Sequence, residues 1–325
     1  MSENQHQRVF VTRAIPAEVL TRLGADFDLV VRETDELPTR AELLAGVSGA
    51  HGMIAMVTDR IDDELFDAAG TQLACIANFA VGYDNVDVPA ATRRGIVVTN
   101  TPGVLSPATA EFTVALMLAL TRRVVEADQL LRSRTPWWWS PTWMLGPGLR
   151  GRRLGIVGMG RIGREVAQLA EAFAMDIVYA GRSRRADVLH EHVSFDELLR
   201  TSHVVSLHCP LTPETRHLIG ADELRRMRDD AVLINTARGP VIDESALVRA
   251  LQTGVIAGAA LDVFEHEPAV HDGLASLGNV VLTPHIGSST QLTRQAMGDL
   301  CASALCAVLL ERRTPPNAIN ADGLE

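Results

Sequence analysis

A glycine-rich turn in the middle of the chain constrains the fold more than any other feature of the sequence. The stretch LGIVGMGRIGREVA places Gly158, Gly160 and Gly163 in a G-x-G-x-x-G pattern, directly after a strand-like apolar run and before a helical segment. In this context the first glycine permits a tight turn, the second admits a pyrophosphate, and the third allows close helix–strand packing. The pyrophosphate is expected at the helix N-terminus, where free N–H groups and the helix dipole favour an anion. We therefore predict a Rossmann-type dinucleotide-binding unit.

The strand after this turn lacks the acidic residue that selects NAD. DIVYA is followed by Gly181, Arg182, Ser183 and Arg184, at the place where an Asp or Glu would bind the adenosine ribose hydroxyls. An acid there repels a 2′-phosphate, whereas arginines and a hydroxyl bind one. The sequence thus favours NADP over NAD, although NAD binding stays possible. A solvated basic turn without any phosphate contact is the alternative.

Short β-branched runs alternate with helical stretches along the chain, which is typical of parallel α/β folds. We expect strands within RVFVT, FDLVV, GMIAMV, LACIANFA and GIVVTN, and then within RRLGIVG, DIVYA, HVVSLHC, AVLINT, IAGAALDV and NVVLT. A long apolar-periodic helix is expected from Ser106, as N-cap before Pro107, to about Leu131, and another from Ser288 to about Arg312. The predicted fold has two Rossmann- or flavodoxin-like α/β domains with parallel sheets. A nucleotide domain of residues 104–288 is inserted into a discontinuous substrate-binding domain of residues 1–103 and 289–325.

The composition narrows the class of protein. The net charge is −10, which argues against a nucleic-acid partner, and the chain contains no lysine, which excludes Schiff-base chemistry and a lysine-dependent phosphate loop. No apolar run approaches the ~20 residues of a membrane helix, and the opening MSENQHQ does not match a secretory signal. The four cysteines form no CxxC pair, and no cluster has metal-ligand spacing. We expect a soluble, cytoplasmic protein without a metal or membrane partner.

Reactive side chains follow the later strands at their carboxyl ends, where open α/β sheets bind ligands. Arg238 follows AVLINT, Asp262 and Glu267 follow IAGAAL, and His285 follows NVVLT. An arginine can bind a carboxylate bidentately and polarise a keto oxygen. A histidine can transfer a proton near neutral pH, and a neighbouring carboxylate orients it and favours its protonated form. Hydride transfer to or from a 2-hydroxy acid requires these residue types.

Five motifs in order make the chain resemble the D-isomer-specific 2-hydroxyacid dehydrogenase family nearly end to end: GIVGMGRIG, LHCPLTPETRHLI, LINTARGPVIDESAL, AGAALDVFEHEP and VVLTPHIGSST. The resemblance implies that Arg238, Glu267 and His285 are catalytic and that Asp262 accepts the nicotinamide carboxamide. It also implies that the loop FAVGYDNVD binds the substrate carboxylate through the N–H groups of Val81 and Gly82, with Arg238 and His285 contacting the substrate. The other implied cofactor contacts are Thr109, Gly158, Gly160, Arg161, Ile162, Gly163, Gly181, Arg182, Ser183, Arg184, Cys209, Pro210, Thr215, Thr236, Ala237 and Gly287.

Within this family, the arginine turn and the loop WSPTWMLG are most similar to glyoxylate/hydroxypyruvate reductases. This resemblance implies a homodimer that prefers NADPH and reduces small 2-keto acids to D-2-hydroxy acids. In those enzymes a loop aromatic can reach the partner's active site, for which Trp138, Trp139 and Trp143 are candidates; packing of a dimer interface is the alternative for these tryptophans.

Two other functions stay open. One is a D-3-phosphoglycerate dehydrogenase-like enzyme, although the sequence ends at Glu325 without the regulatory extension common in that group. The other is a non-enzymatic NAD(H)-sensing protein like the C-terminal-binding-protein corepressors, for which an NADP-type turn is poorly suited.

Overall fold

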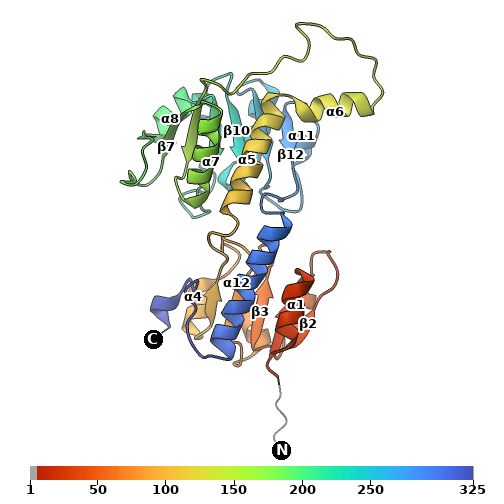
Figure 1. Ribbon diagram of the computed structural model, residues 1–325, viewed down its shortest axis with the longest axis vertical. Coiled ribbons are helices and arrows are strands. Elements are labelled where there is room, and N and C mark those ends of the chain that lie inside the picture. The colour runs from red at the N-terminus through yellow and green to blue at the C-terminus, as the bar shows by residue number, and fades with distance from the viewer. Residues whose placement is uncertain (1–5, 325) are drawn as a thin grey trace, which may run out of the picture. The chain divides into compact units, whose positions relative to one another are not determined.

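The computed structural model describes residues 6–324, which divide into two compact units (Figure 1). Unit 1 takes in the chain up to Leu105 and from Ser289 onward, and unit 2 takes in Ser106–Ser288. The sequence placed the first boundary after residue 103, and the assignment of unit 1 to substrate binding stays a prediction. The first five residues, where no secretory signal is expected, lie outside the described part of the chain.

Unit 1 contains a parallel sheet of five strands in the order β2-β1-β3-β4-β5, which is the flavodoxin-like order. The strands are β1 (Arg8–Val11), β2 (Asp28–Val31), β3 (Gly52–Ala55), β4 (Cys75–Asn78) and β5 (Val97–Thr99). The helices are α1 (Ala17–Gly24), α2 (Arg40–Val47), α3 (Asp63–Ala69), α4 (Val88–Arg93) and α12 (Gln291–Leu309). Helix α12 packs along the sheet, where Gly52 leaves room for it because a Cβ at that position would lie 2.6 Å from Leu305. Strands β3 and β4 are therefore buried along their whole length.

Unit 2 contains a parallel sheet of seven strands in the order β12-β11-β10-β9-β6-β7-β8. These strands are β6 (Arg153–Val157), β7 (Asp176–Ala180), β8 (Glu191–His192), β9 (Val204–Leu207), β10 (Val232–Asn235), β11 (Gly258–Leu261) and β12 (Val280–Leu282). Strand β6 pairs with β7 on one side and with β9 on the other, so the strand order reverses there. A dinucleotide binds at this switch point in the Rossmann fold, outside the carboxyl ends of the strands. The two parallel sheets confirm the predicted fold class.

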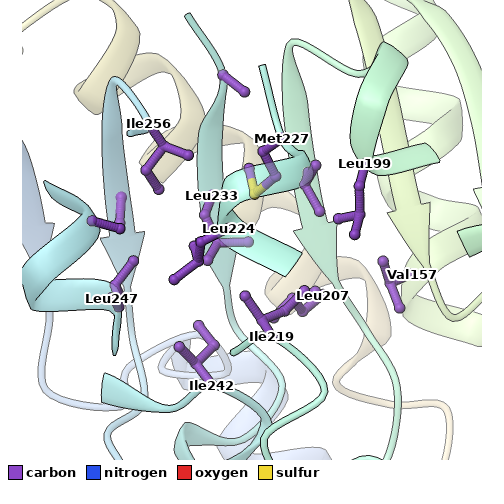
Figure 2. Close-up of a cluster of buried hydrophobic side chains, with 14 of the residues drawn as sticks. Val157, Leu199, Leu207, Ile219, Leu224, Met227, Leu233, Ile242, Leu247 and Ile256 are labelled. Carbon is purple, nitrogen blue, oxygen red and sulfur yellow. The ribbon is translucent and has the colours of Figure 1, made fainter. Parts of the chain in front are cut away.

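The helices of unit 2 pack on both faces of its sheet, except that the helix of residues 124–132 has no buried residue. They are α5 (Ser106–Thr121), α6 (Val124–Arg132), α7 (Arg161–Ala172), α8 (Phe195–Thr201), α9 (Ala221–Arg226), α10 (Glu244–Gln252) and α11 (Asp272–Ala275). Successive strand residues point to opposite faces: Val232 and Ile234 join the core beneath α5 and α7, whereas Leu233 joins the other core. Figure 2 shows that second core, in which Leu199, Leu224 and other side chains from the helices meet Leu207 and Leu233 of the strands.

The structure corrects several details of the predicted elements. The helix expected from Ser106 to about Leu131 is two helices, because Arg123 has a left-handed φ of 54° between α5 and α6. Ser106 is the first residue of α5 rather than its N-cap. Strand β8 was not predicted, since two polar residues give no apolar run.

The last helix is shorter than expected. It begins after Thr290, whose hydroxyl accepts a hydrogen bond from the Thr293 amide at 3.1 Å, and it ends at Leu309. No helix among residues 6–324 has the length and apolar character that a membrane crossing needs.

Candidate active site

The glycine turn of unit 2 lies at the carboxyl end of β6, and its three glycines differ in the space around them. Gly158 has a φ of +99°, and a Cβ there would lie 2.8 Å from backbone atoms of His208 and Cys209. A Cβ at Gly163 would lie 2.4 Å from the Gly158 carbonyl oxygen, so helix and turn pack backbone to backbone. Around Gly160, by contrast, a Cβ would meet nothing within 4 Å. Space is thus open at the glycine that a pyrophosphate is expected to approach.

The same turn forms the N-terminus of α7. Gly160 is the N-cap residue, and Arg161, Ile162 and Gly163 form the first helical turn. The N–H groups of a first turn have no partner within the helix and carry the positive end of its dipole. Together with the open space at Gly160, they provide the donors that a nucleotide diphosphate requires.

The basic turn after β7 is exposed, and the charge of Arg182 contributes to lowering the pKa of the Glu214 carboxyl. A Cβ at Gly181 would meet nothing within 4 Å, and Arg182, Ser183 and Arg184 are exposed. Within residues 6–324 neither Arg182 nor Arg184 forms an ion pair, whereas the nearby Asp187 is paired with Arg164 at 2.9 Å. The end of β7 therefore presents two guanidinium groups and a hydroxyl to solvent.

A histidine–glutamate pair lies beyond the carboxyl ends of β11 and β12. His285 Nδ1 lies 2.8 Å from Glu267 Oε2, while Glu267 Oε1 accepts a hydrogen bond from the Phe264 amide at 3.0 Å. Burial by itself would raise the pKa of Glu267, but the hydrogen bond and charge of His285, with smaller effects of Phe264 and Arg238, lower that pKa below its ordinary value. The carboxylate is therefore ionised at neutral pH and fixes the imidazole through Nδ1.

Asp262 fixes the loop that carries His285. Asp262 is 1% exposed. Its Oδ1 accepts hydrogen bonds from the Thr283 hydroxyl at 2.7 Å and from the Ile286 amide at 2.9 Å. Its Oδ2 accepts one from the Gly287 amide at 2.7 Å. The His285 amide also donates to the Asp262 carbonyl at 2.8 Å. Burial raises the pKa of Asp262, which these hydrogen bonds oppose. The residue expected to contact nicotinamide thus also holds the Thr283 side chain before His285 and the two backbone amides after it.

Arg238 lies just beyond β10, next to the segment that carries Glu267. Its carbonyl accepts a hydrogen bond from the Asn235 side chain at 2.9 Å, and its guanidinium donates to the Ala237 carbonyl at 2.9 Å. A Cβ at Gly239 would overlap the Phe264 backbone, so the two segments are in close contact. The structure therefore brings Arg238, Glu267 and His285 together at one edge of the sheet.

The remaining predicted cofactor residues of unit 2 lie around this edge, and several already have hydrogen-bond partners. The Thr236 hydroxyl bonds that of Thr113 at 2.9 Å. The Thr215 hydroxyl donates to the Pro210 carbonyl at 2.6 Å, so it stabilises its own turn.

Burial raises the pKa of Cys209 to about 11, which keeps its thiol neutral and unsuited to nucleophilic chemistry. Thr109 is buried on α5, and its methyl group is near the position that a Cβ of Gly287 would take. No group of three His, Cys, Asp or Glu side chains within the described part of the chain could hold a metal.

Val81 and Gly82 lie in unit 1, in the loop after β4. Their carbonyl oxygens accept hydrogen bonds from the side chains of Asn100 and Asn78, at 2.8 Å and 2.9 Å. Neither asparagine was predicted as a functional residue; the available signal was a polar residue at the end of each of two buried strands, β4 and β5.

The chain matches known proteins along nearly its whole length. The family model described as "D-isomer specific 2-hydroxyacid dehydrogenase, NAD binding domain" matches residues 114–287. The chain is 46% identical to the glyoxylate reductase of Thermococcus litoralis, covering 98% of each protein. It is 48% identical to the glyoxylate reductase of Thermofilum pendens, covering 98% of this chain and 96% of the relative.

Solved structures show the same fold. The TT0316 protein of Thermus thermophilus superposes with a TM-score of 0.91 and 47% identity, covering 96% of this chain and 100% of the other. The NADPH-dependent glyoxylate/hydroxypyruvate reductase of Sinorhizobium meliloti, in complex with NADP and malonate, has a TM-score of 0.82 and 37% identity, with 94% of each chain covered. The non-enzymatic alternative is therefore set aside. The chain belongs to the D-isomer-specific 2-hydroxyacid dehydrogenase family and is an NAD(P)-dependent oxidoreductase.

Proposed function

We propose that the protein is an NADPH-preferring reductase of small 2-keto acids, with glyoxylate and hydroxypyruvate as its first candidates, and that it forms D-2-hydroxy acids. The observation that carries the proposal is the His285–Glu267 pair beside Arg238, on the same sheet as the glycine turn. Support for the substrate class comes from the names of the relatives, which are glyoxylate reductases at 46% and 48% identity.

The cofactor preference is inferred from the end of β7. Gly181 places no negative charge beside the adenosine ribose, and Arg182, Ser183 and Arg184 would bind a 2′-phosphate through charge-assisted hydrogen bonds. The first turn of α7 would hold the pyrophosphate, and Asp262 Oδ2 would accept a hydrogen bond from the nicotinamide carboxamide. The chemistry that the bound cofactor supplies is a hydride for the keto carbon.

The protein's own residues would bind the keto acid and supply the proton. Arg238 and the N–H groups of Val81 and Gly82 would hold its carboxylate. His285 uses Nδ1 for Glu267, which leaves Nε2 to donate a proton to the keto oxygen as negative charge develops there. Glu267, ionised and hydrogen-bonded at both oxygens, would keep the imidazole oriented.

Two steady-state experiments test this function. Turnover with glyoxylate, hydroxypyruvate, pyruvate and 3-phosphohydroxypyruvate gives the substrate class; a clear preference for the phosphorylated acid would support the phosphoglycerate dehydrogenase-like alternative.

His285→Ala should lower kcat by roughly 10²- to 10⁴-fold, the usual contribution of a general acid, with NADPH affinity preserved. Near-normal turnover of that variant would remove His285 from the mechanism.

We also propose a homodimer that uses the loop after α6. Trp138 and Trp139 are 77% and 80% exposed, whereas Trp137 and Trp143 stack on each other with ring centroids 6.1 Å apart. Exposed aromatic pairs of this kind are typical of interfaces.

Light scattering should give twice the chain mass, and a monomer would contradict the proposal. Trp138→Ala or Trp139→Ala should lower kcat/KM if that side chain reaches the partner's site.

A further inference from the structure

The substrate loop of unit 1 has its carbonyl groups bound within the unit. Asn100 donates from Nδ2 to the Val81 carbonyl at 2.8 Å, and Asn78, which is fully buried at the end of β4, donates to the Gly82 carbonyl at 2.9 Å. The Thr101 amide donates to the Ala80 carbonyl at 2.9 Å. Three successive carbonyl groups of the loop are thus fixed by neighbours from β4 and from the segment after β5.

Fixing a carbonyl also fixes the next amide. In a trans peptide the C=O of one residue and the N–H of the next point in opposite directions. The Thr101 contact therefore sets the direction of the Val81 N–H, and the Asn100 contact sets that of the Gly82 N–H. Among the hydrogen bonds of residues 6–324, none is donated by either amide, and both residues are half-buried. Two neighbouring N–H groups held outward form a concavity suited to an anion.

Asn100 is itself anchored. The side chain of Asn317, from the segment after α12, donates to the Asn100 carbonyl at 2.7 Å, and the Asn100 amide donates to the Asn317 carbonyl at 3.4 Å. Asn78 is likewise linked to Asn85, whose side chain donates to the Asn78 side-chain oxygen at 3.1 Å. The two asparagines that bind the loop are therefore held in place by contacts independent of the loop's carbonyl groups.

We propose that Asn100, supported by Asn78, is a positioning residue that directs the Gly82 N–H toward the carboxylate of the 2-keto acid. This inference rests on the proposed function, because it takes the loop amides as the carboxylate-binding groups. Asn100 would not touch the substrate itself. Its effect would be on substrate binding in the ground state and transition state alike, so it should change KM rather than kcat.

Asn100→Asp tests this role, because it preserves size but replaces the donor with a carboxylate oxygen facing the Val81 carbonyl. The peptide should turn away, and the KM for glyoxylate should rise about tenfold or more, with kcat changed less than threefold and NADPH affinity unchanged. Asn320→Asp is the matched control: Asn320 also lies in unit 1 and donates to a backbone carbonyl, that of Ile96, at 2.9 Å. It should lower stability without raising KM.

Binding of oxamate, an unreactive 2-keto acid analogue, to the NADPH complex gives a readout that does not require turnover. Its dissociation constant should rise about tenfold in Asn100→Asp and stay unchanged in Asn320→Asp. If Asn100→Asp does not fold, Asn100→Ala removes the same donor without adding charge and should raise both constants at least threefold. The inference would be overturned if a folded Asn100 variant kept the KM for glyoxylate and the dissociation constant of oxamate unchanged. It would also be overturned if Asn320→Asp changed these constants equally, or if the natural protein did not bind oxamate. Failure of the natural protein to reduce any 2-keto acid would instead refute the proposed function, and the oxamate comparison would still decide the role of Asn100.

Discussion

Replacing Glu267 by glutamine should separate the charge of this residue from its shape. The carboxylate accepts two hydrogen bonds, from the Phe264 amide at Oε1 and from His285 at Oε2. A glutamine side chain has one acceptor, so it cannot satisfy both donors. Whichever way the amide turns, the variant loses either the contact with the Phe264 amide or the contact that orients the His285 imidazole.

The expected size of the effect follows from the contact with His285. A hydrogen bond to a charged group contributes about 1.5–3 kcal/mol, and each 1.36 kcal/mol is about a factor of ten in rate. The side chains of His285 and Glu267 are 32% and 22% exposed, which weakens their interaction through solvent screening. We therefore expect kcat/KM for glyoxylate to fall about 10- to 30-fold in Glu267→Gln.

Steady-state kinetics with NADPH measure this change, and Glu265→Gln is the matched control. Glu265 forms a similar pair, with Oε1 2.5 Å from His217 Nε2, but lies outside the proposed catalytic set. Its variant should stay within threefold of the natural enzyme. The pKa of Glu267 lies below the ordinary glutamate value of 4.5, so its carboxylate is ionised at all pH values above 4.5. The difference in kcat/KM between the natural enzyme and Glu267→Gln should therefore narrow only below that pH. A folded Glu267→Gln enzyme with kcat/KM within twofold of normal would refute the role of the pair.

Three further predictions concern unit 2. Gly181→Asp should reduce the NADPH/NADH ratio of kcat/KM at least about tenfold, because the new carboxylate would repel a 2′-phosphate; an unchanged ratio would remove the basic turn from cofactor selection. Asp262→Asn should lower the free energy of unfolding by about 1–3 kcal/mol in urea titrations, because an amide cannot accept the hydrogen bonds of Thr283, Ile286 and Gly287 together. Burial lowers the pKa of His208 to about 4, so unfolding takes up a proton between pH 6.5 and 4 and stability should fall as pH drops through that range. His208→Asn should remove about 2 kcal/mol of the stability difference between pH 7 and pH 5, and an unaltered pH dependence would contradict a neutral His208 in the folded protein.

The strands were predictable because parallel strands buried on both faces are continuous apolar runs. DIVYA coincides with β7, and the other expected runs each contain one strand. The break between α5 and α6 was not predictable, since it depends on a left-handed conformation at Arg123 that an apolar-periodic sequence does not reveal. Strand β8 forms only through pairing with β7, and its own residues show no strand pattern.

The candidate site was predictable to the extent that topology controls it. Parallel strands end at one edge of a sheet, so residues after β10, β11 and β12 had to be neighbours, and Arg238, Glu267 and His285 lie close together there. Their spacing in sequence does not show that His285 uses Nδ1 for Glu267. The roles of Asn78 and Asn100 escaped prediction because a polar residue at the end of a buried strand does not show which loop carbonyl its side chain binds.

A comparison of NADPH and NADH as hydride donors for glyoxylate tests the proposed function most directly. The exposed guanidinium groups of Arg182 and Arg184, beside Gly181, predict a kcat/KM at least about tenfold higher with NADPH. Equal or greater efficiency with NADH, or no reduction of glyoxylate with either donor, would contradict it.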